Sequence, residues 1–518
     1  CGNSLIGARR QIYRVNQLPT GSGRKAKPTH LWHEHAPEEL AWHAALPADA
    51  IFHFLLPDPG MAAYSDKVIK ELEPDAIERC KRWNKAFVGE SFSEDQIEHL
   101  LRLSQLVNGL WKDWAQQQSQ LRQRTTDPLP VWGEDTDATD AAWTSLKQKD
   151  SIQEQEILGR DVAQTNARLR LKWAMDYWCA LWFWPIRQAG SLPTRRDWLY
   201  ELSMILGDYE QTVGPEDGQQ KLFPDTQPKH QAEEFADRHG FVDVEKLKAE
   251  FERLRQVEAV AKRIRPLHWD LEFADLLRNG GFDLVLGNPP WMRSEWSQDN
   301  FLSEKSPMLS KDFEGRKESD LNHERKMLLA RAGRELLQEY ETAAGTKSLL
   351  PKRFFLSSGN FNHYRCFIEL IHGISKDNAI LAMVHDCGIF ENRKEPELRK
   401  FLYPRLRYLF RFVNQILNGS KLFPDLDNNQ KFELSVLKSQ RDVHATAISF
   451  KAIFSLFTPS TIGSCLEEVE VSSVDNRQPL PEGIKTSEGK WNTTGEPARA
   501  VHFTPQVLRV MSLLTSGD

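Results

Sequence analysis

The sequence has few cysteines for its length, and no two of them lie close together. Only six occur among 518 residues, at positions 1, 80, 179, 366, 387 and 465. A structural zinc site needs closely spaced cysteine or histidine pairs, and a secreted disulfide framework needs many cysteines in a short chain. The spacing therefore predicts a reducing compartment, the cytoplasm, and no metal.

Long hydrophobic runs are also absent, and we expect no signal peptide. The richest apolar run, Trp173 to Ile186, contains Asp176 and is too short to cross a bilayer. We therefore expect a buried helix there and no membrane contact. Charged residues make up 27% of the chain and hydrophobic residues 40%, which is typical of a soluble globular protein. The net charge of −6 neither favours nor excludes nucleic acid, because binding requires only a local basic face.

The most informative stretch is Gly281 to Trp291, with the sequence GFDLVLGNPPW. The apolar run 282–286 predicts a short buried strand that ends at Gly-Asn-Pro-Pro. Two prolines stiffen the backbone and supply no N–H groups, so the neighbouring carbonyls are free to face a ligand. An aromatic ring follows at once. These residues suit an exocyclic amine on a flat ring, although an ordinary strand-to-loop turn is the alternative.

This tetrapeptide resembles the Asn-Pro-Pro-aromatic motif of amino-group methyltransferases that use S-adenosylmethionine. The resemblance implies that Asn288 and the carbonyl of Pro289 accept hydrogen bonds from the target amine. It implies that Pro290 stiffens the turn and that Trp291 stacks on a flipped base. Trp291 departs from the commoner Tyr or Phe of the family but preserves stacking. Catalysis in this family is mostly alignment and electrostatics.

The first residues of the chain, CGNSLIG, carry a second, weaker resemblance to the same family. It implies that Asn3 and Ser4 help to hold the cofactor S-adenosylmethionine, together with Gly287. A simple turn explains the run equally well. No glycine-rich cofactor loop and no acidic residue for the ribose are found, and both would precede Cys1. We therefore expect the chain to be a fragment.

The fold class implied by the resemblance is α/β. We expect an incomplete Rossmann-like methyltransferase sheet with a large helical insertion and the start of a C-terminal recognition region. Periodic apolar positions predict helices within 66–122, 153–186 and 242–264, with loops near 125–140 and 213–229. Ser93 and Gln96 predict a capping box. The expected regions are the end of the N-terminal core half (1–30), the insertion (31–265), the catalytic core (266–440) and the recognition region (441–518).

After Trp291, residues 292–322 are polar and predict a mobile loop in which Arg293 either contacts a phosphate or faces solvent. A helix from 362 and a strand at 378–385 predict a right-handed crossover between parallel strands. The last two strands are expected at 410–415 and 432–437. The resemblance makes Phe432 a candidate clamp for the flipped base, with a core phenylalanine as the alternative. Residues 398–408 are basic with aromatic residues interleaved. This pattern predicts either the lining of a DNA channel or a helix that packs its aromatic side chains inward.

Two residues invite other chemistry. His268, with Asp270 and Glu272 nearby, could suggest a metal site, but no second ligand pair has the required spacing. Cys387 could suggest a nucleophile, but no activating group is visible beside it in the sequence, which favours a packing role.

The size and the tracts 362–367 and 402–408 resemble gamma-class N6-adenine DNA methyltransferases of single-chain restriction–modification and phage-defence systems (BREX-like or DISARM-like). The implied partners are double-stranded DNA and, in some systems, other defence subunits. No nuclease motif is found, because Pro224-Asp225 lacks the acidic and lysine partner pair. Two alternatives stay open: a non-catalytic DNA-binding or assembly subunit derived from such an enzyme, and a methyltransferase acting on an amino group of RNA or protein.

Overall fold

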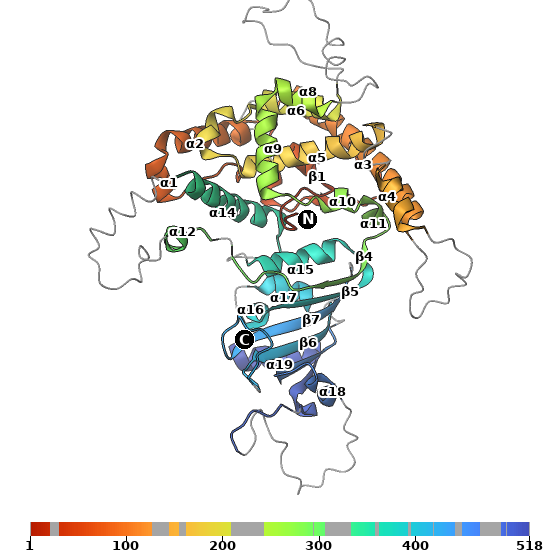
Figure 1. Cartoon of the computed structure of the whole chain (residues 1–518), viewed down its shortest axis with the longest axis vertical. Coiled ribbons are helices and arrows are strands. Elements are labelled where there is room, and N and C mark those ends of the chain that lie inside the picture. Colours follow the sequence, from red (N-terminus) through yellow and green to blue (C-terminus); the bar gives the residue numbers. More distant parts are fainter. Residues whose placement is uncertain are drawn as a thin grey trace, which may run out of the picture. The chain divides into compact units, whose positions relative to one another are not determined.

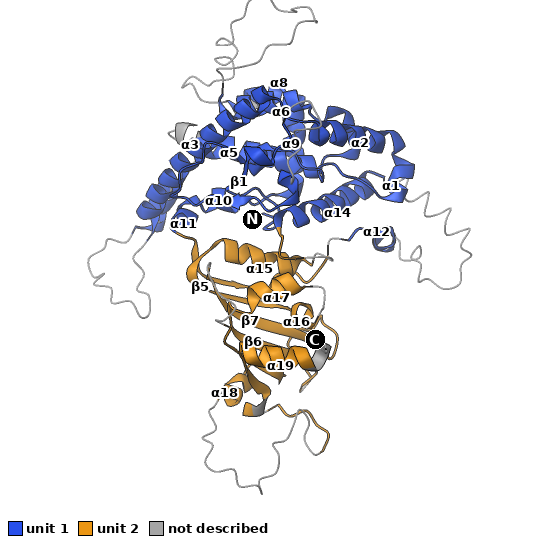
Figure 2. Ribbon diagram, turned by 180° about the vertical axis from the view of Figure 1, so that it is seen from behind, with its two compact units in different colours: residues 1–279, 294–353 blue, residues 280–293, 354–518 orange. Residues whose placement is uncertain are grey.

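We analysed a computed structural model of the chain, shown in Figure 1. The structure describes residues 2–20, 31–126, 144–154, 162–208, 243–293, 295–305, 333–357, 362–391, 395–417, 419–440, 448–466, 488–493 and 495–516. The chain forms two compact units, coloured separately in Figure 2. The helical unit contains residues 1–279 and 294–353, and the sheet unit contains residues 280–293 and 354–518.

The helical unit consists of α-helices, short 3-10 helices and one small sheet. Its α-helices are α1 (Lys67–Leu72), α2 (Pro74–Gly89), α3 (Glu94–Thr125), α4 (Leu146–Glu154), α5 (Val162–Trp182), α6 (Arg195–Leu206), α8 (Val244–Glu250), α9 (Glu252–Ile264), α10 (Trp269–Glu272), α11 (Ala274–Arg278), α12 (Gln298–Lys305) and α14 (Gly333–Arg353). Its 3-10 helices are η1 (Val15–Gln17), η2 (Trp32–Glu34), η3 (His53–Leu55) and η5 (Ile186–Ser191). Its antiparallel sheet has the order β2 (Glu38–Glu39), β1 (Gln11–Arg14), β3 (Ala50–Phe52).

Local signals explain where several of these helices begin and end. The predicted capping box at α3 is confirmed: Gln96 N donates to Ser93 Oγ (3.2 Å), and Ser93 N donates to Gln96 Oε1 (3.3 Å). The single helix expected over 242–264 is instead two helices, because Phe251 leaves the helical conformation and forms the N-cap of α9. Of the expected loops, 213–229 and most of 125–140 lie outside the described residues.

Large aromatic side chains form the core of the helical unit. Trp32, Trp111, Trp182, Trp184 and Trp198 are all fully buried. Burying one large apolar side chain contributes about 1.5–3 kcal/mol, so this cluster dominates the stability of the unit. These tryptophans therefore have the packing role that the sequence suggested. Within the described residues, no helix is both long and apolar enough to span a membrane.

A buried polar network joins the first residues of the chain to α5 and α10. His268 Nδ1 accepts from Ala8 N (3.0 Å), and its Nε2 lies 3.0 Å from Asp176 Oδ1. Arg9 forms an ion pair with Asp270, which also accepts from Arg10 N (3.0 Å). Both ring nitrogens of His268 therefore have protein partners. This histidine holds three segments together and is not a metal ligand in this arrangement.

The sheet unit contains a six-stranded mixed sheet. Its strands are β4 (Phe282–Gly287), β5 (Ser375–Asp386), β6 (Leu406–Asn414), β7 (Gln430–Lys438), β8 (Phe450–Leu456) and β9 (Ala500–Phe503). Its helices are α15 (His363–Gly373), α16 (Gly388–Glu391), α17 (Pro396–Leu402), α18 (Thr461–Leu466), η8 (Pro497–Arg499) and α19 (Pro505–Ser516). The spatial order is β4-β5-β7-β6-β8-β9. Strands β4 and β5 are parallel, as are β6 and β8, whereas β7 is antiparallel to both β5 and β6.

The sequence predicted part of this sheet. The strand before Asn288, the helix from 362 and the following strand are confirmed as β4, α15 and β5, and β4 and β5 are parallel. The expectation that the first of these strands is buried is wrong, because β4 lies at the edge of the sheet, where Leu284 and Leu286 are exposed. The prediction that β6 and β7 are the last strands is wrong, because β8 and β9 follow. Residues 450–456 are mostly apolar, but this short run lies among Ser- and Thr-rich segments that are typical of loops. The expected mixed α/β class is correct, whereas the four-region division of the chain remains a prediction.

The two faces of this sheet are covered differently. Helices α15, α17 and α19 pack on one face against Leu381, Met383 and Leu409. On the other face, Phe410, Phe412 and Ile453 pack with Cys465 of α18. Near the β4 edge, Leu284 is 56% exposed, Leu286 67% and Ile380 41%. The sheet is therefore well packed at β6 to β8 and open at β4.

Candidate functional site

The candidate site lies where β4 ends. Because β4 runs parallel to β5 and β6 runs parallel to β8, with β7 antiparallel between the two pairs, the carboxyl ends of these four strands share one edge of the sheet. Open α/β sheets place ligands at this edge. Gly281, the residue before β4, has φ 114°, and a Cβ there would collide with the carbonyl of Ile374. A glycine is thus required for β4 to align with β5.

The Asn-Pro-Pro segment leaves β4 at this edge. Asn288 is exposed, Pro289 is buried and Pro290 is exposed. The side chain of Asn288 forms no hydrogen bond with any residue in the part of the chain that the structure describes. A surface carboxamide without a protein partner, held beside two rigid prolines, is available to a ligand.

Trp291 is half-buried, and its indole is held in place. The indole Nε1 donates to the carbonyl of Val384 near the end of β5 (3.3 Å). The same ring packs against both hydrophobic clusters of the sheet unit. A ring fixed by a hydrogen bond at its edge and still partly accessible provides a stacking surface.

Two phenylalanines pack beside this tryptophan. The Trp291 ring centroid lies 6.2 Å from that of Phe432 at 31° and 6.0 Å from that of Phe423 at 61°. Phe432 also stacks on Phe412 at 5.2 Å and 8°. Phe432 is only 4% exposed, so most of its ring is buried in the core. This agrees with the alternative that Phe432 is a core phenylalanine. Phe423, in the β6–β7 loop and half-buried, was not a sequence candidate.

Gly287 and Arg293 flank the Asn-Pro-Pro-Trp segment. Gly287 is exposed, and a Cβ there would have no atom within 4 Å, so open space borders its Cα. Arg293 is exposed and pairs by its backbone with Asn362, at the start of α15. Its guanidinium has no hydrogen-bond or ion-pair partner among the described residues. Arg293 is therefore free to contact an anion or solvent.

Asn3 and Ser4 belong to the helical unit. Asn3 Oδ1 accepts from Leu5 N (3.2 Å), which closes a local turn, and Asn3 forms a backbone bridge with Pro266. The carbonyl of Ser4 accepts from the indole of Trp269 (3.0 Å). The local turn that the sequence offered as an alternative is therefore present. The cofactor role of these two residues remains a prediction.

Buried ionisable groups lie beneath the carboxyl edge. Glu433 Oε1 accepts from two nitrogens of Arg411 (2.8 and 2.6 Å), while Glu433 Oε2 is buried without a hydrogen-bond partner. Burial raises the pKa of Glu433 to about 7 and lowers that of His385 to about 4. His385 Nε2 lies 3.0 Å from Ser435 Oγ, and its ring stacks on Tyr364. These groups align β5, β6 and β7, and the sequence did not single out any of them for this role.

Cys387 follows β5 at the same edge. Its Sγ lies 3.4 Å from Glu391 Oε2, and burial, followed by the nearby Glu391 charge, raises the thiol pKa to about 12. A thiol held in its neutral form is a poor nucleophile, which agrees with the packing role predicted for it. Among the described residues, no group of three or more His, Cys, Asp or Glu side chains could hold a metal ion.

A pocket of about 520 Å³ lies beyond β6 and β8. Leu417 follows β6, Thr458 and Ser460 follow β8, and Lys490, Trp491 and Thr493 complete the lining. Since β6 and β8 are parallel, this pocket lies on the same sheet edge as Asn288. A cation, an indole and three hydroxyls could contact a nucleic-acid backbone.

Comparison with known families yields one match. Residues 154–323 match the family model described as the Eco57I restriction-modification methylase. The matched range includes Asn288 to Trp291 and much of the helical unit. It covers a minority of the chain, and it supports a DNA methyltransferase of a restriction–modification system. No curated protein matches the sequence.

Two solved structures are similar in part. One is an ATP-dependent Type ISP restriction-modification enzyme, LlaBIII, bound to DNA, at 11% identity and a TM-score of 0.19 over 36% of this chain and 12% of that chain. The other is the DrdV–DNA complex, at 11% identity and a TM-score of 0.19 over 39% of this chain and 19% of that chain. The matches thus span less than a fifth of either larger protein. Because these TM-scores are low, the fold class rests on the order and directions of the strands and not on these two structures.

Proposed function

We propose that the protein is a site-specific DNA methyltransferase that transfers a methyl group from S-adenosylmethionine to N6 of a flipped adenine. The observation that carries this proposal is the arrangement at the end of β4. The Asn288 carboxamide is exposed and has no hydrogen-bond partner among the described residues, and two prolines separate it from Trp291, whose indole is hydrogen-bonded and partly accessible. The match of residues 154–323 to a restriction-modification methylase family supports the same class of enzyme.

The proposed chemistry uses few groups. The carboxamide oxygen of Asn288 and the carbonyl of Pro289 accept the two N–H groups of the adenine amine. These bonds draw the nitrogen lone pair out of conjugation with the ring and direct it toward the methyl donor. Trp291 stacks on the base, and Pro290 keeps the turn rigid. No strong base is required, which fits a site edge where Cys387 is neutral and His385 is buried.

S-adenosylmethionine, when bound, would supply the methyl group from its sulfonium and leave as a neutral thioether, and the surplus proton of the methylated amine would pass to solvent water. Gly287 fits this cofactor, because open space borders its Cα next to the reacting segment. Asn3 and Ser4 are the other proposed contacts. The topology of the sheet unit is consistent with half of a Rossmann-like methyltransferase core, in which β4 would stand next to the cofactor-binding half.

The proposed partner is double-stranded DNA, in a restriction–modification or phage-defence system. Arg293 has a guanidinium available for a phosphate. Lys490 and Trp491, at the pocket beyond β6 and β8 on the same edge, offer a further backbone contact. The paired acceptors fit an exocyclic amine with two N–H groups on a flat ring, and adenine is proposed as that base on the resemblance to N6-adenine methyltransferases.

The test incubates the complete protein with S-adenosylmethionine labelled in its methyl group and with duplex DNA, RNA or protein as acceptors. The proposal expects label in DNA and, after digestion to nucleosides, N6-methyl-2′-deoxyadenosine as the labelled product. Label in RNA or protein alone would reassign the substrate. DNA binding without cofactor uptake would identify a non-catalytic subunit.

A further inference from the structure

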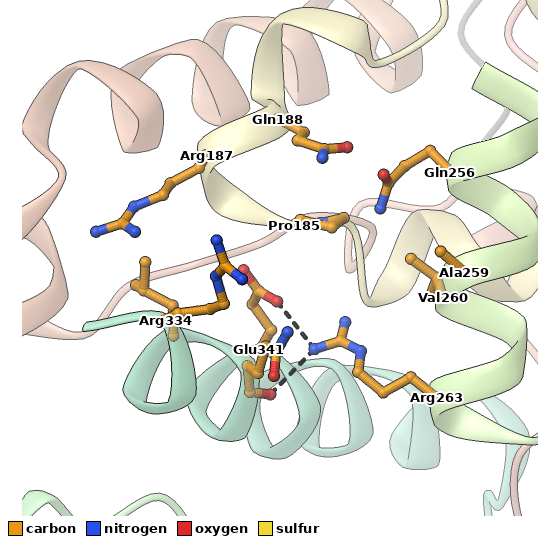
Figure 3. A pocket seen from close by; sticks show the side chains of 11 residues that line it. Pro185, Arg187, Gln188, Gln256, Ala259, Val260, Arg263, Arg334 and Glu341 are labelled. Carbon is orange, nitrogen blue, oxygen red and sulfur yellow. Dashed lines mark hydrogen bonds and ion pairs between the residues drawn. The ribbon is translucent and has the colours of Figure 1, made fainter. Parts of the chain in front are cut away.

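A second pocket of different character lies in the helical unit. It has a volume of about 580 Å³ and opens between η5, α9 and α14 (Figure 3). Three arginines and three glutamines form most of its polar lining. Arg187 and Gln188 come from η5, Gln256 and Arg263 from α9, and Arg334 and Gln338 from α14.

One of these arginines is structural. Arg263 donates to Glu341 Oε2 (3.0 Å) and to the carbonyls of Gln338 (3.2 Å) and Phe183 (2.8 Å). Glu341 Oε1 accepts from Ile186 N (2.8 Å), and Glu341 is 2% exposed. The pair therefore links η5, α9 and α14 beneath the pocket. Because the Glu341 carboxylate is held by Arg263, it leaves little negative charge to face a ligand.

The other two arginines are more available. Arg187 donates by Nε to Glu73 at 2.7 Å, in a pair whose Arg187 side chain is 56% exposed. Exposed ion pairs of this kind contribute little to stability. The other N–H groups of the Arg187 guanidinium are not used in the pair with Glu73. Arg334 is exposed and has no hydrogen-bond or ion-pair partner within the described part of the chain. Figure 3 shows that both side chains belong to the lining of this pocket.

We propose that this pocket binds phosphate groups, with Arg334 and Arg187 as the charged contacts and the amides of Gln188 and Gln256 as neutral donors. Guanidinium groups match the geometry of phosphate oxygens, and they are used wherever bidentate recognition of phosphate is needed. The volume lies within the range of about 300–1,000 Å³ that is typical of ligand pockets. A backbone phosphate of DNA and the phosphates of a free nucleotide share this chemistry. The site lies in the helical unit and does not depend on the proposed methyl transfer.

The test uses the full chain and measures fluorescence anisotropy with two probes, a fluorescent nucleoside triphosphate and a fluorescein-labelled duplex. Each titration is repeated with inorganic tripolyphosphate as competitor. Arg334→Gln removes the unpartnered charge and is expected to weaken binding of the recognised probe about tenfold, the loss of one charge-assisted contact. Arg187→Gln should have a smaller effect, because Glu73 already engages part of its guanidinium.

Arg255→Gln is the matched control. Arg255 is exposed on α9, the helix that supplies Gln256 and Arg263, and it is not part of the pocket lining. This variant makes the same change of charge and should alter the affinity for either probe less than about twofold. Circular dichroism melting of all three variants checks that the helical unit stays folded.

The outcomes separate the two sources of phosphate. If Arg334→Gln weakens duplex binding and lowers the slope of log affinity against log salt by about 1, the ligand is a DNA backbone phosphate. If only the nucleoside triphosphate is affected, and tripolyphosphate competes with it, the ligand is a free nucleotide. Unchanged binding of both probes by Arg334→Gln, or an equal loss with Arg255→Gln, would overturn the proposal. None of these readouts depends on methyl transfer, so a failure of the proposed function would not be mistaken for a failure here.

Discussion

The tryptophans of the helical core and the tryptophan at the β4 edge have different surroundings. In the helical unit, Trp182 and Trp198 lie between helices with almost no exposure. In the sheet unit, Trp291 and Phe423 stay half-buried at the carboxyl edge of the sheet. Aromatic side chains therefore stabilise the helical core and remain accessible to a ligand at the β4 edge.

Polar groups differ between two particular places. In the helical unit, both ring nitrogens of His268 and both oxygens of Glu341 have protein partners. At the carboxyl edge of the sheet unit, the Asn288 carboxamide and Glu433 Oε2 have no hydrogen-bond partner within the described residues. Buried atoms without such a partner also occur in the helical unit, at Trp111 Nε1 and Trp182 Nε1, so the contrast lies between these networks and the β4 edge and not between whole units.

The largest effect is expected from truncating a tryptophan in the helical core. Trp182 is fully buried, so Trp182→Ala leaves a cavity and should lower the free energy of unfolding by about 4 kcal/mol. Denaturant unfolding followed by circular dichroism measures the change. A loss below about 1 kcal/mol would mean that the helical core is loosely packed.

The matched change in the sheet unit, Trp291→Ala, should behave differently. Because the ring is only half-buried, we expect the unfolding free energy to fall by no more than about 2 kcal/mol. Methyl transfer should fall at least about tenfold through the loss of stacking, and Trp291→Phe should retain most of it. Equal losses of stability for Trp182→Ala and Trp291→Ala would remove the contrast between the two units.

The next prediction concerns the alignment of β4. Gly281 has φ 114°, and a Cβ there would collide with the backbone of Ile374 and Ser375. Gly281→Ala should therefore destabilise the sheet unit by about 3 kcal/mol. Gly287→Ala is the control, since a Cβ there meets nothing within 4 Å. Thermal unfolding of the two variants should differ clearly, and similar melting temperatures would contradict the observed start of β4.

The smallest expected effect is a dependence of stability on pH. Burial raises the pKa of Glu433 from its ordinary value of 4.5 to about 7. Between these values the native state binds more protons than the unfolded state, so this group lowers the unfolding free energy as the pH rises from about 5 to 7.5. Glu433→Gln removes the ionisation. Relative to the wild type, the variant should gain about 2 kcal/mol across this window.

Chemical unfolding at pH 5 and at pH 7.5 measures that gain. Glu341 and Asp58, whose pKa values burial also raises, are present in both proteins and cancel in the comparison. His385, with its lowered pKa, is likewise unchanged. A difference between variant and wild type that does not change with pH would show that Glu433 is ionised throughout.

Some elements of both units could be predicted because their signals are local. The apolar run 282–286 ends at Gly-Asn-Pro-Pro, and the capping box at Ser93 depends on residues three apart, so neither requires tertiary information. Strands β8 and β9 were missed, since short strands among Ser, Thr and Pro resemble loops. Within the candidate site, Phe423 and Glu433 acquire their importance only when β6 and β7 pair. The arginine pocket joins residues from three distant segments, and no sequence pattern connects them.

The most direct test of the central claim is methyl transfer by Asn288→Ala in the complete protein. The carboxamide is exposed and has no protein partner among the described residues, so its removal should leave folding unchanged. DNA binding should also be largely retained. We predict that transfer of labelled methyl groups to DNA is lost while the melting temperature and the DNA affinity stay close to the wild-type values. Normal methylation by Asn288→Ala would contradict the account, because the edge of β4 would then not hold the target amine.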